Sequence, residues 1–403
     1  MTEKNKSIRN FPNKRNVPKL RFSEFTDEWE ENYISEVISS KSKKYNPETN
    51  DVNYPSIELE SLSQDSGELL STFDSKNQKS IKNVFNSGDV LFGKLRPYLK
   101  KYYLVDFDGV CSSEIWVLKS SILDSNYLYA FVQSNSFISL TEISSGSKMP
   151  RADWNLVSSS SIFYPSNSDE RKKIGQIIQL LNSRIHTQKK IIEQLETLIK
   201  GVGYKLFNKK IRFKNTDLSE FPSWESKKGN DVFSNISNKN HNSELPILAI
   251  TQEYGAIPRD LIDFKISVTD KSVESYKIVE KGDFIISLRS FQGGIEYSEY
   301  KGICSPAYII LRNKMEVNSY FYKYYFKSEY YIKQLNKKLE GIRDGKMISY
   351  AYFSDINLPL PSLNEQTKIA NFLYSIQEKI ETENQILEKL ELQKRFLLAN
   401  LFV

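Results

Sequence analysis

Two polar loops in the first half of the chain carry cations of the kind that contact an anionic polymer. The loops are GKLRPYLKK (93–101) and GSKMPRADW (146–154). Lysine and arginine bind phosphate oxygens, and arginine also donates two parallel hydrogen bonds to a guanine edge. We predict a DNA-contacting surface made of Lys94, Arg96, Lys100, Lys101, Lys148 and Arg151. The alternative for any one of these residues is an exposed charge that contacts nothing.

Two loops of the second half correspond to these and carry amide and hydroxyl groups as well as cations. They are SLRSFQGG (287–294) and GIRDGKMISYAYF (341–353), and the pair Lys148-Met149 recurs as Lys346-Met347. Arginine and glutamine are the residue types that make paired hydrogen bonds to guanine and adenine edges. The DNA-contacting candidates here are Arg289, Ser290, Gln292, Arg343, Lys346 and Tyr350.

The chain lacks the motifs of the common catalytic sites. It contains no glycine-rich phosphate loop, no HExxH, no Asn-Pro-Pro-aromatic methyltransferase motif and no nuclease pairing of acids with lysine. Its two histidines, His186 and His241, give no credible zinc site and little scope for histidine catalysis. We therefore expect no catalytic residues and no metal in this chain. A self-contained DNA methyltransferase or nuclease is the rival interpretation, which these absences disfavour.

A long repeated segment organises the rest of the chain. Residues 169–207 recur at 364–402 with a constant shift of 195 positions. The identical pairs include Glu170 with Glu365 and Lys173 with Lys368. A repeat of this length indicates an internal duplication.

Each copy of the repeat predicts a long helix with a heptad seam. Alternating steps of four and three select Ile174, Ile178 and Leu181 onward to Leu206, and Ile369 and Leu373 onward to Leu401. The seam is interrupted in the middle by Gln188 and by its repeat partner Glu383, which would meet in an antiparallel pair and fix its register. The alternative is two amphipathic helices packed on separate domains.

Connectivity favours the antiparallel arrangement. A helix of this length spans about 55 Å at 1.5 Å per residue, so the chain between the copies returns most easily to a neighbouring helix end. We expect a basic disordered tail (1–16), a first domain (17–168), a first helix (169–207), a second domain (208–363) and a second helix (364–403). The domains are predicted to be mixed α/β and related, with the helices, by a pseudo-twofold axis in a dumbbell-shaped molecule. SLNEQTKI (362–369) carries a capping-box spacing at the start of the second helix.

Composition places the chain among soluble intracellular proteins. Of its 403 residues, 39% are hydrophobic and 26% charged, and no apolar run approaches the ~20 residues of a membrane span. The net charge of +6 supports nucleic-acid binding only weakly. Cys111 and Cys304 lie at matching points of the duplication, so we expect the same strand in each domain, no disulfide and a cytoplasmic, reducing compartment.

These features together resemble the specificity subunit of type I restriction-modification systems. The resemblance covers nearly the whole chain from Val17 and is carried by NEQTKIANFL (364–373), its copy DERKKIGQII (169–178), and the domain starts EFTDEWEE and SEFPSWE. Segments ISLRSFQGGIE, GKLRPYLKK and GSKMPRADW also resemble segments common in such domains. The fold it implies is two mixed α/β target-recognition domains separated by two long antiparallel coiled-coil helices.

The resemblance implies a non-catalytic reader of double-stranded DNA. Each domain would read one half of a split, asymmetric target, and the helices would set the spacer and dock methyltransferase subunits, two in number. Restriction and translocation subunits would join for cleavage. S-adenosylmethionine, ATP and magnesium would be bound by those partners and not by this chain. A coiled-coil scaffold that binds only protein is the remaining alternative, and it predicts no retardation of DNA.

Overall fold

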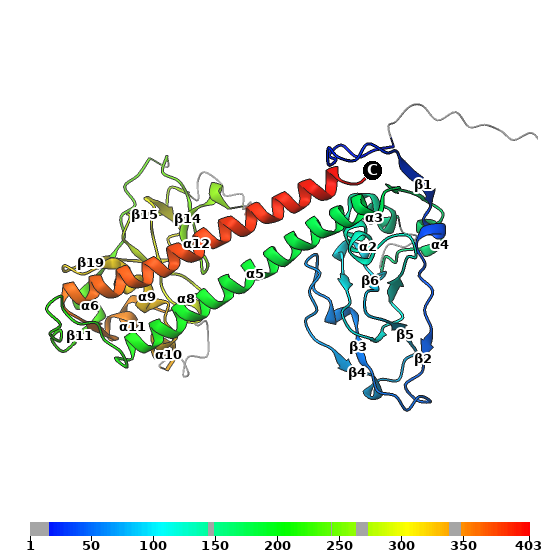
Figure 1. Cartoon of the computed structure of the whole chain (residues 1–403). Helices are drawn as coiled ribbons and strands as arrows, with labels where there is room; N and C mark the ends of the chain where they lie inside the picture. The colour runs from blue at the N-terminus through cyan, green and yellow to red at the C-terminus, as the bar shows by residue number, and fades with distance from the viewer. Residues whose placement is uncertain (1–15, 144–148, 243, 263–272, 338–347) are drawn as a thin grey trace, which may run out of the picture. The chain divides into compact units, whose positions relative to one another are not determined.

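The computed structural model describes residues 16–143, 149–242, 244–262, 273–337 and 348–403 (Figure 1). The chain divides into two compact units, one of Met1–Lys190 with Gln385–Val403 and the other of Ile191–Asn384. The two long helices are α5 (Ser168–Phe207) and α12 (Leu363–Asn400). Each unit therefore contains one domain and part of each long helix. None of the described helices combines the length and apolar character that a membrane-spanning segment needs.

The heptad seam predicted for the two helices is confirmed. Every seam position from Ile174 to Leu206 and from Ile369 to Leu401 is buried or half-buried, whereas most positions between them are exposed. Apolar side chains at this spacing form one stripe along a helix, and burial of that stripe stabilises a helix that would be marginal by itself. The helix α5 is continuous through Gly201 and Gly203.

The helices run antiparallel within each unit. In the first unit, Ile174 and Ile178 near the start of α5 share one buried cluster with Leu397 and Leu401 at the end of α12. Further along in the same unit, Lys189 of α5 pairs with a glutamate of α12 at 3.4 Å. In the second unit, the end of α5 and the start of α12 contribute to one cluster. Residue numbers rise along one helix as they fall along the other, as the prediction required.

The described residues of the first domain form three sheets and four α-helices. Strands β1 and β10 form one antiparallel pair, β2-β5-β8-β3-β4 a second sheet and β7-β6-β9 a third. The strands are β1 (Trp29–Tyr33), β2 (Lys44–Tyr45), β3 (Pro55–Ile57), β4 (Phe73–Asp74), β5 (Lys82–Phe85), β6 (Val90–Gly93), β7 (Tyr102–Leu104), β8 (Gly109–Cys111), β9 (Ile115–Leu118) and β10 (Ser161–Pro165). The helices are α1 (Ile34–Val37), α2 (Ser125–Gln133), α3 (Asn135–Glu142) and α4 (Trp154–Ser158), with short 3₁₀ turns η1 (Leu59–Ser61), η2 (Ser75–Asn77) and η3 (Pro97–Leu99).

The second domain repeats this mixed α/β composition. Its sheets are β11-β20, β12-β19-β16-β17, β13-β14 and β15-β18. The strands are β11 (Glu225–Lys228), β12 (Phe233–Ile236), β13 (Leu248–Thr251), β14 (Gly255–Pro258), β15 (Lys277–Val279), β16 (Phe284–Ile286), β17 (Glu296–Tyr297), β18 (Gly302–Cys304), β19 (Ile309–Asn313) and β20 (Asn357–Leu360). The helical elements are α6 (Gly229–Val232), η4 (Arg259–Leu261), α8 (Ser290–Gly293), α9 (Ser319–Phe326), α10 (Glu329–Lys337) and α11 (Tyr350–Ser354).

Matched details relate the two domains. Gly88 and Gly282 both have positive φ, 90° and 98°, at the turns that precede β6 and β16. Cys111 and Cys304 are buried and unbonded on β8 and β18, which pair antiparallel with β5 and β15. The first and last strands of each domain pair with each other, β1 with β10 and β11 with β20. The domains are therefore the products of one duplication in structure as well as in sequence.

Two helical stretches of the domains are each divided into two helices. The stretch 127–138 is broken between α2 and α3 at Ser134, whose extended backbone and side-chain oxygen cap α3. The stretch 320–335 is broken between α9 and α10, where the Ser328 hydroxyl accepts a hydrogen bond from Tyr331 N at 3.2 Å. Serine competes for backbone groups in this way and favours helix starts over helix interiors.

Candidate nucleic-acid interface and the junctions behind it

The two cationic loops of the first domain are hydrogen bonded to each other. Arg96 N donates to Pro150 O at 2.8 Å, and Ala152 N donates to Lys94 O at 2.8 Å. An isolated bridge joins Leu95 to Arg151. Segments more than 50 residues apart in sequence therefore form one surface of the first unit, where the prediction placed the candidate cations.

Arg96 occupies a constrained position on this surface. Arg96 and Lys100 both have left-handed backbones, with φ of 52° and 46°, on either side of η3. Side chains with a Cβ rarely adopt this conformation, which costs on the order of 1 kcal/mol for each residue. The loop bonds to Pro150 and the bond from Asp65 N to Lys100 O hold it there. The Arg96 side chain remains exposed, so the strain presents a cation at the surface.

The other described candidate cations of the first domain are half-buried or form contacts within the protein. Lys94, Lys100 and Lys101 are half-buried, and Lys101 Nζ donates to Leu59 O at 2.6 Å. Arg151 is exposed, with its Nε donating to Glu114 Oε2 at 3.1 Å. Lys148 lies outside the described residues. Arg96 and Arg151 are therefore the exposed cations among the described candidates on this surface, and Arg151 is paired with Glu114.

The corresponding loop of the second domain presents two of its three candidates. Arg289 and Gln292 are exposed at the two ends of the short helix α8, and Gln292 N donates to Arg289 O at 2.9 Å. Ser290 is 1% exposed, and its hydroxyl accepts a hydrogen bond from Ser287 N at 2.9 Å. The Ser290 hydroxyl therefore holds the loop and is not presented at the surface. Gly294 closes the turn with φ of 81°, where an added Cβ would lie 2.1 Å from Phe326 O.

The second polar loop of this domain is described only at its end. Arg343 and Lys346 lie outside the described residues. Tyr350 is half-buried, and its hydroxyl donates to Phe233 O at 3.0 Å, which ties α11 to β12.

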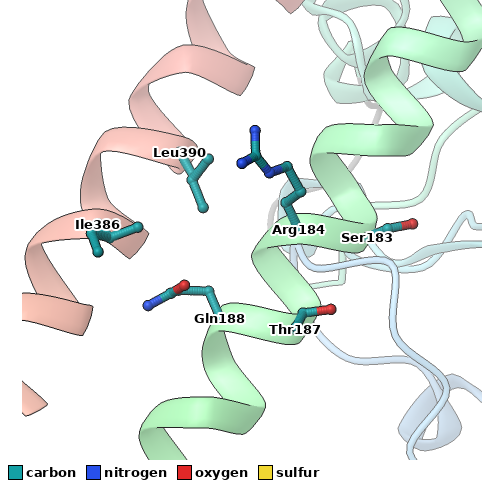
Figure 2. A pocket seen from close by; sticks show the side chains of 6 residues that line it. All are labelled: Ser183, Arg184, Thr187, Gln188, Ile386 and Leu390. Atoms are coloured by element: carbon teal, nitrogen blue, oxygen red, sulfur yellow. The ribbon is translucent and has the colours of Figure 1, made fainter.

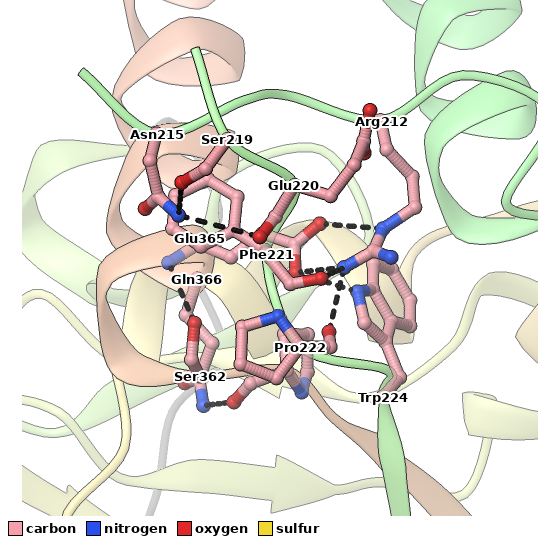
Figure 3. A network of polar contacts seen from close by, with 11 residues as sticks. Arg212, Asn215, Ser219, Glu220, Phe221, Pro222, Trp224, Ser362, Glu365 and Gln366 are labelled. Atoms are coloured by element: carbon pink, nitrogen blue, oxygen red, sulfur yellow. Dashed lines mark hydrogen bonds and ion pairs between the residues drawn. The ribbon is translucent and has the colours of Figure 1, made fainter. Parts of the chain in front are cut away.

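Each domain is joined to a long helix by an ion pair with a buried glutamate, which the heptad and loop patterns of the sequence did not reveal. In the second unit, Glu365 at the start of α12 is 0% exposed and accepts from Arg212 Nε at 3.0 Å and Arg212 Nη2 at 2.7 Å (Figure 3). Trp224 Nε1 donates to the same carboxylate at 2.9 Å. Arg212 also donates to Pro222 O at 2.8 Å. This group, which we call the second clamp, fastens the start of the domain to the start of the helix.

The first unit contains the equivalent clamp. Glu170 of α5 is also 0% exposed and accepts from Arg21 Nε and Nη2 at 2.7 and 2.8 Å and from Trp29 Nε1 at 3.3 Å. The hydrogen bond to the glutamate raises the pKa of each arginine, with burial acting in the opposite direction. Bidentate arginine–carboxylate pairs of this kind are strong and fix the orientation as well as the position of the two side chains.

A signal for the clamps is present in the sequence. Leu20-Arg21-Phe22 recurs as Ile211-Arg212-Phe213, and both glutamates are among the identical repeat positions. Composition alone marks the segment 208–215 only as basic. The capping box expected at Ser362 is formed by half, since Ser362 Oγ accepts from Glu365 N at 3.4 Å while the Glu365 carboxylate is bound by Arg212 and Trp224.

The middle of the helix pair contains the two residues proposed to set its register. Gln188 and Glu383 are 8% and 7% exposed, and Lys379 Nζ lies 2.5 Å from Glu383 Oε1. Gln188 and Arg184 point from α5 toward Ile386 and Leu390 of α12 and line a hollow of about 270 Å³ (Figure 2). Gln188 and Glu383 belong to different units, so their mutual register remains a prediction.

Two other polar residues connect the helices to the first domain. His186 is exposed as expected, and its Nδ1 lies 2.9 Å from Glu68 Oε1. Lys394 takes a seam position, is 9% exposed, and places Nζ 3.5 Å from the Tyr102 hydroxyl. Burial lowers the pKa of Lys394 to about 8. Within the described parts of the chain, no group of three or more His, Cys, Asp or Glu residues is arranged to hold a metal ion.

Comparison with known proteins agrees with this architecture. The family model described as "Type I restriction modification DNA specificity domain" matches residues 26–197 and again residues 211–392. The MjaVIII type I restriction enzyme specificity subunit of Methanocaldococcus jannaschii is 28% identical over 335 residues, 77% of this chain and 74% of that protein. The putative MjaX specificity subunit of the same organism is 30% identical over 244 residues, 56% of this chain and 55% of that protein.

A solved structure shares the fold. The S subunit of a type I restriction-modification system from M. genitalium superposes with a TM-score of 0.60 and 16% identity, covering 96% of this chain and 99% of that one. Two matched recognition domains and two long helices define a class of DNA-recognition subunits. The chain belongs to the type I restriction modification DNA specificity family, and its function is target recognition in such a system.

Proposed function

We propose that each domain reads one half of a split, asymmetric DNA target and that the paired helices set the distance between the halves. The duplication carries this proposal, since it gives two related domains with exposed polar loops at matched positions after β6 and β16. Base edges in the major groove are distinguished by hydrogen bonds of the kind that Arg96, Arg289 and Gln292 can make. The spacing between the two half-sites in the duplex then follows from the distance and orientation at which the helices hold the two domains.

The chain would act together with catalytic partners. We propose two methyltransferase subunits docked on the long helices, with S-adenosylmethionine bound by those subunits. Restriction subunits that use ATP and magnesium would join for cleavage. Leu392 and Phe396 of α12 and Leu198 and Tyr204 of α5 are large apolar side chains at 43–58% exposure, which suits contact with another protein.

Methylation mapping of a complex reconstituted with its modification subunit tests whether each domain recognises one half of the target. Arg96→Ala is expected to relax the sequence preference in one half of the target, and a paired Arg289→Ala, Gln292→Ala variant in the other half. Lys228→Ala, which removes an exposed cation of the second domain outside these loops, is the matched control and should keep both halves. If the Arg96 and Arg289 variants relaxed the same half, the assignment of one domain to one half-site would be wrong.

Two simpler measurements separate the alternatives. Methylation of DNA by the isolated chain with labelled cofactor would show a self-contained methyltransferase. Absence of DNA retardation by the reconstituted complex would leave a protein scaffold.

A further inference from the structure

The second domain contains a large cleft beside the loop that carries Arg289. It encloses about 770 Å³ between the β13–β14 hairpin, the start of η4 and the loop after β16. Arg259, Arg289, Tyr254 and Tyr308 line it, with Glu296 on β17. A concave surface of this size fits a projecting group such as the sugar-phosphate backbone, whereas base edges within a groove are reached by protruding side chains.

Arg259 places a hydrogen-bond donor in this cleft. It is the first residue of η4, and its backbone N donates to Ile247 O at 3.0 Å, so its position is fixed by the hairpin. Its Nη1 is buried and has no hydrogen-bond acceptor among the residues that the structure describes. Buried donors almost always have a partner, and Arg259 also lines the cleft. Its guanidinium therefore keeps a hydrogen-bonding position that an acceptor entering the cleft can take after a small side-chain movement.

Both arginines line the cleft together with Tyr308. Burial raises the pKa of Tyr308, and the positive charges of Arg259 and Arg289 both oppose that rise. Arg289 is exposed and Arg259 half-buried. The guanidinium of Arg259 provides the fork-shaped set of donors that phosphate oxygens accept, and Arg289 adds positive charge to the same cleft.

The carboxylate of Glu296 does not cancel this charge. It is 1% exposed and is paired with Lys327, whose Nζ lies 2.6 Å from Oε1 and 2.5 Å from Oε2. Lys327 Nζ also donates to Gln252 O at 3.2 Å, and Gln252 Nε2 donates to Arg289 O at 3.4 Å. These bonds join the hairpin to the α8 loop, so the two walls are held before any ligand binds.

We propose that this cleft binds a backbone phosphate of the DNA next to the half-site read by the second domain, with Arg259 as its principal ligand. The inference rests on the proposed function, since the phosphate belongs to the target duplex. A phosphate contact fixes the position of a domain on the duplex without specifying a base.

Arg259→Ala in the complex with the modification subunit tests this assignment. We expect about 5- to 50-fold weaker binding to every duplex, an unchanged methylation target, and a slope of log affinity against log salt smaller by about 1. Arg259→Lys should recover part of the affinity, because it keeps the charge but not the fork. Lys228→Ala is the charge-matched control outside the cleft. Native circular dichroism of each variant identifies any that fails to fold, and Arg259→Gln then replaces it.

The outcomes distinguish failure of the proposed DNA-recognition function from failure of the phosphate-binding assignment. If the unsubstituted complex bound no DNA, the proposed function would fail. If it bound DNA and Arg259→Ala kept the affinity and the salt slope, the cleft assignment would be overturned, as it would by a loss restricted to one base pair. Hydrogen exchange over 252–262 should slow with the duplex but not with inorganic phosphate at the same phosphate concentration. Protection by inorganic phosphate alone would instead make this a site for a free anion.

Discussion

Removing the arginine of one clamp should loosen one domain-to-helix junction and leave the other intact. Arg212→Met keeps an apolar stem of similar length but withdraws both donors from Glu365, which then retains only Trp224 Nε1 among these three contacts. Leaving one partner of a buried ion pair behind costs roughly 3–5 kcal/mol. Because Arg212 is 23% exposed and water can reach its side of the pair, we expect the lower end, about 3 kcal/mol.

Hydrogen exchange read by mass spectrometry measures this cost locally. A loss of about 3 kcal/mol corresponds to an approximately hundredfold loss of protection, and it should fall on peptides covering β11 and the first turns of α12. Arg21→Met is the matched variant and should affect β1 and the start of α5 instead. The double variant Arg212→Met, Glu365→Gln should cost less than Arg212→Met alone, since no buried charge is left unpaired.

The pattern of protection decides whether the reasoning holds. Loss spread evenly over both units would show that the clamp acts on global stability. A change below about 0.5 kcal/mol, the usual limit for a surface substitution, would show that the Glu365 carboxylate is satisfied without Arg212. Either result would refute the local clamp.

Three further predictions concern buried charges and the helix pair. Burial lowers the Lys394 pKa from 10.5 to about 8, so the stability of the first unit should increase between about pH 8 and pH 10.5. Lys394→Ile, which introduces the residue found at the repeat-related position Ile199, should raise Tm at pH 7 and remove this increase of stability with pH. Burial raises the Glu296 pKa from 4.5 to about 7, outweighing Lys327, so the second unit should lose up to about 3 kcal/mol between those pH values. Thermal unfolding of Glu296→Gln should show its advantage over the unsubstituted chain grow from pH 5 to pH 8, and a constant difference would contradict the assignment. Inserting one heptad beside both Gln188 and Glu383 adds about 10 Å to the helices, so methylation mapping should find both half-sites with a spacer longer by roughly three base pairs at ~3.4 Å each. Inserting two residues instead should abolish assembly, because it disrupts the heptad seam. An unchanged spacer after the heptad insertion would show that the helices do not set the spacing.

The duplication made the helices and the class of fold predictable from the sequence. Because the shift of 195 positions is constant along the repeat, the same steps of four and three recur in both copies, and the buried stripe from Ile174 could be located without coordinates. The loops around Arg96 and Arg289 could be located for the same reason, because their flanking strands also recur. Their exposure agrees with the prediction, but their contacts with DNA remain predictions.

What could not be predicted depends on contacts between distant segments. Trp29 lies seven positions after Phe22, whereas Trp224 lies eleven positions after Phe213, so the constant shift fails between arginine and tryptophan and hides the clamps. The sequence predicts a surface hydroxyl at Ser290, whereas its burial arises from the packing of the α8 loop and not from its neighbours in sequence. Arg259 gave no signal, since a single arginine after a hairpin has no distinguishing spacing.

The pairing of β1 with β10, and of β11 with β20, has a consequence for how such a protein changes its target. Because the two ends of each domain are hydrogen bonded to each other beside the start of a long helix, the chain enters and leaves the domain at one place. Genetic recombination at those two ends would replace a whole domain while leaving the helix sequences untouched. A newly acquired domain would need first and last strands that pair with each other, and an arginine and a tryptophan that bind the buried glutamate at the start of the helix. With one half of the target read by each domain, as we propose, one such exchange would change one half of the target and leave the other half unchanged.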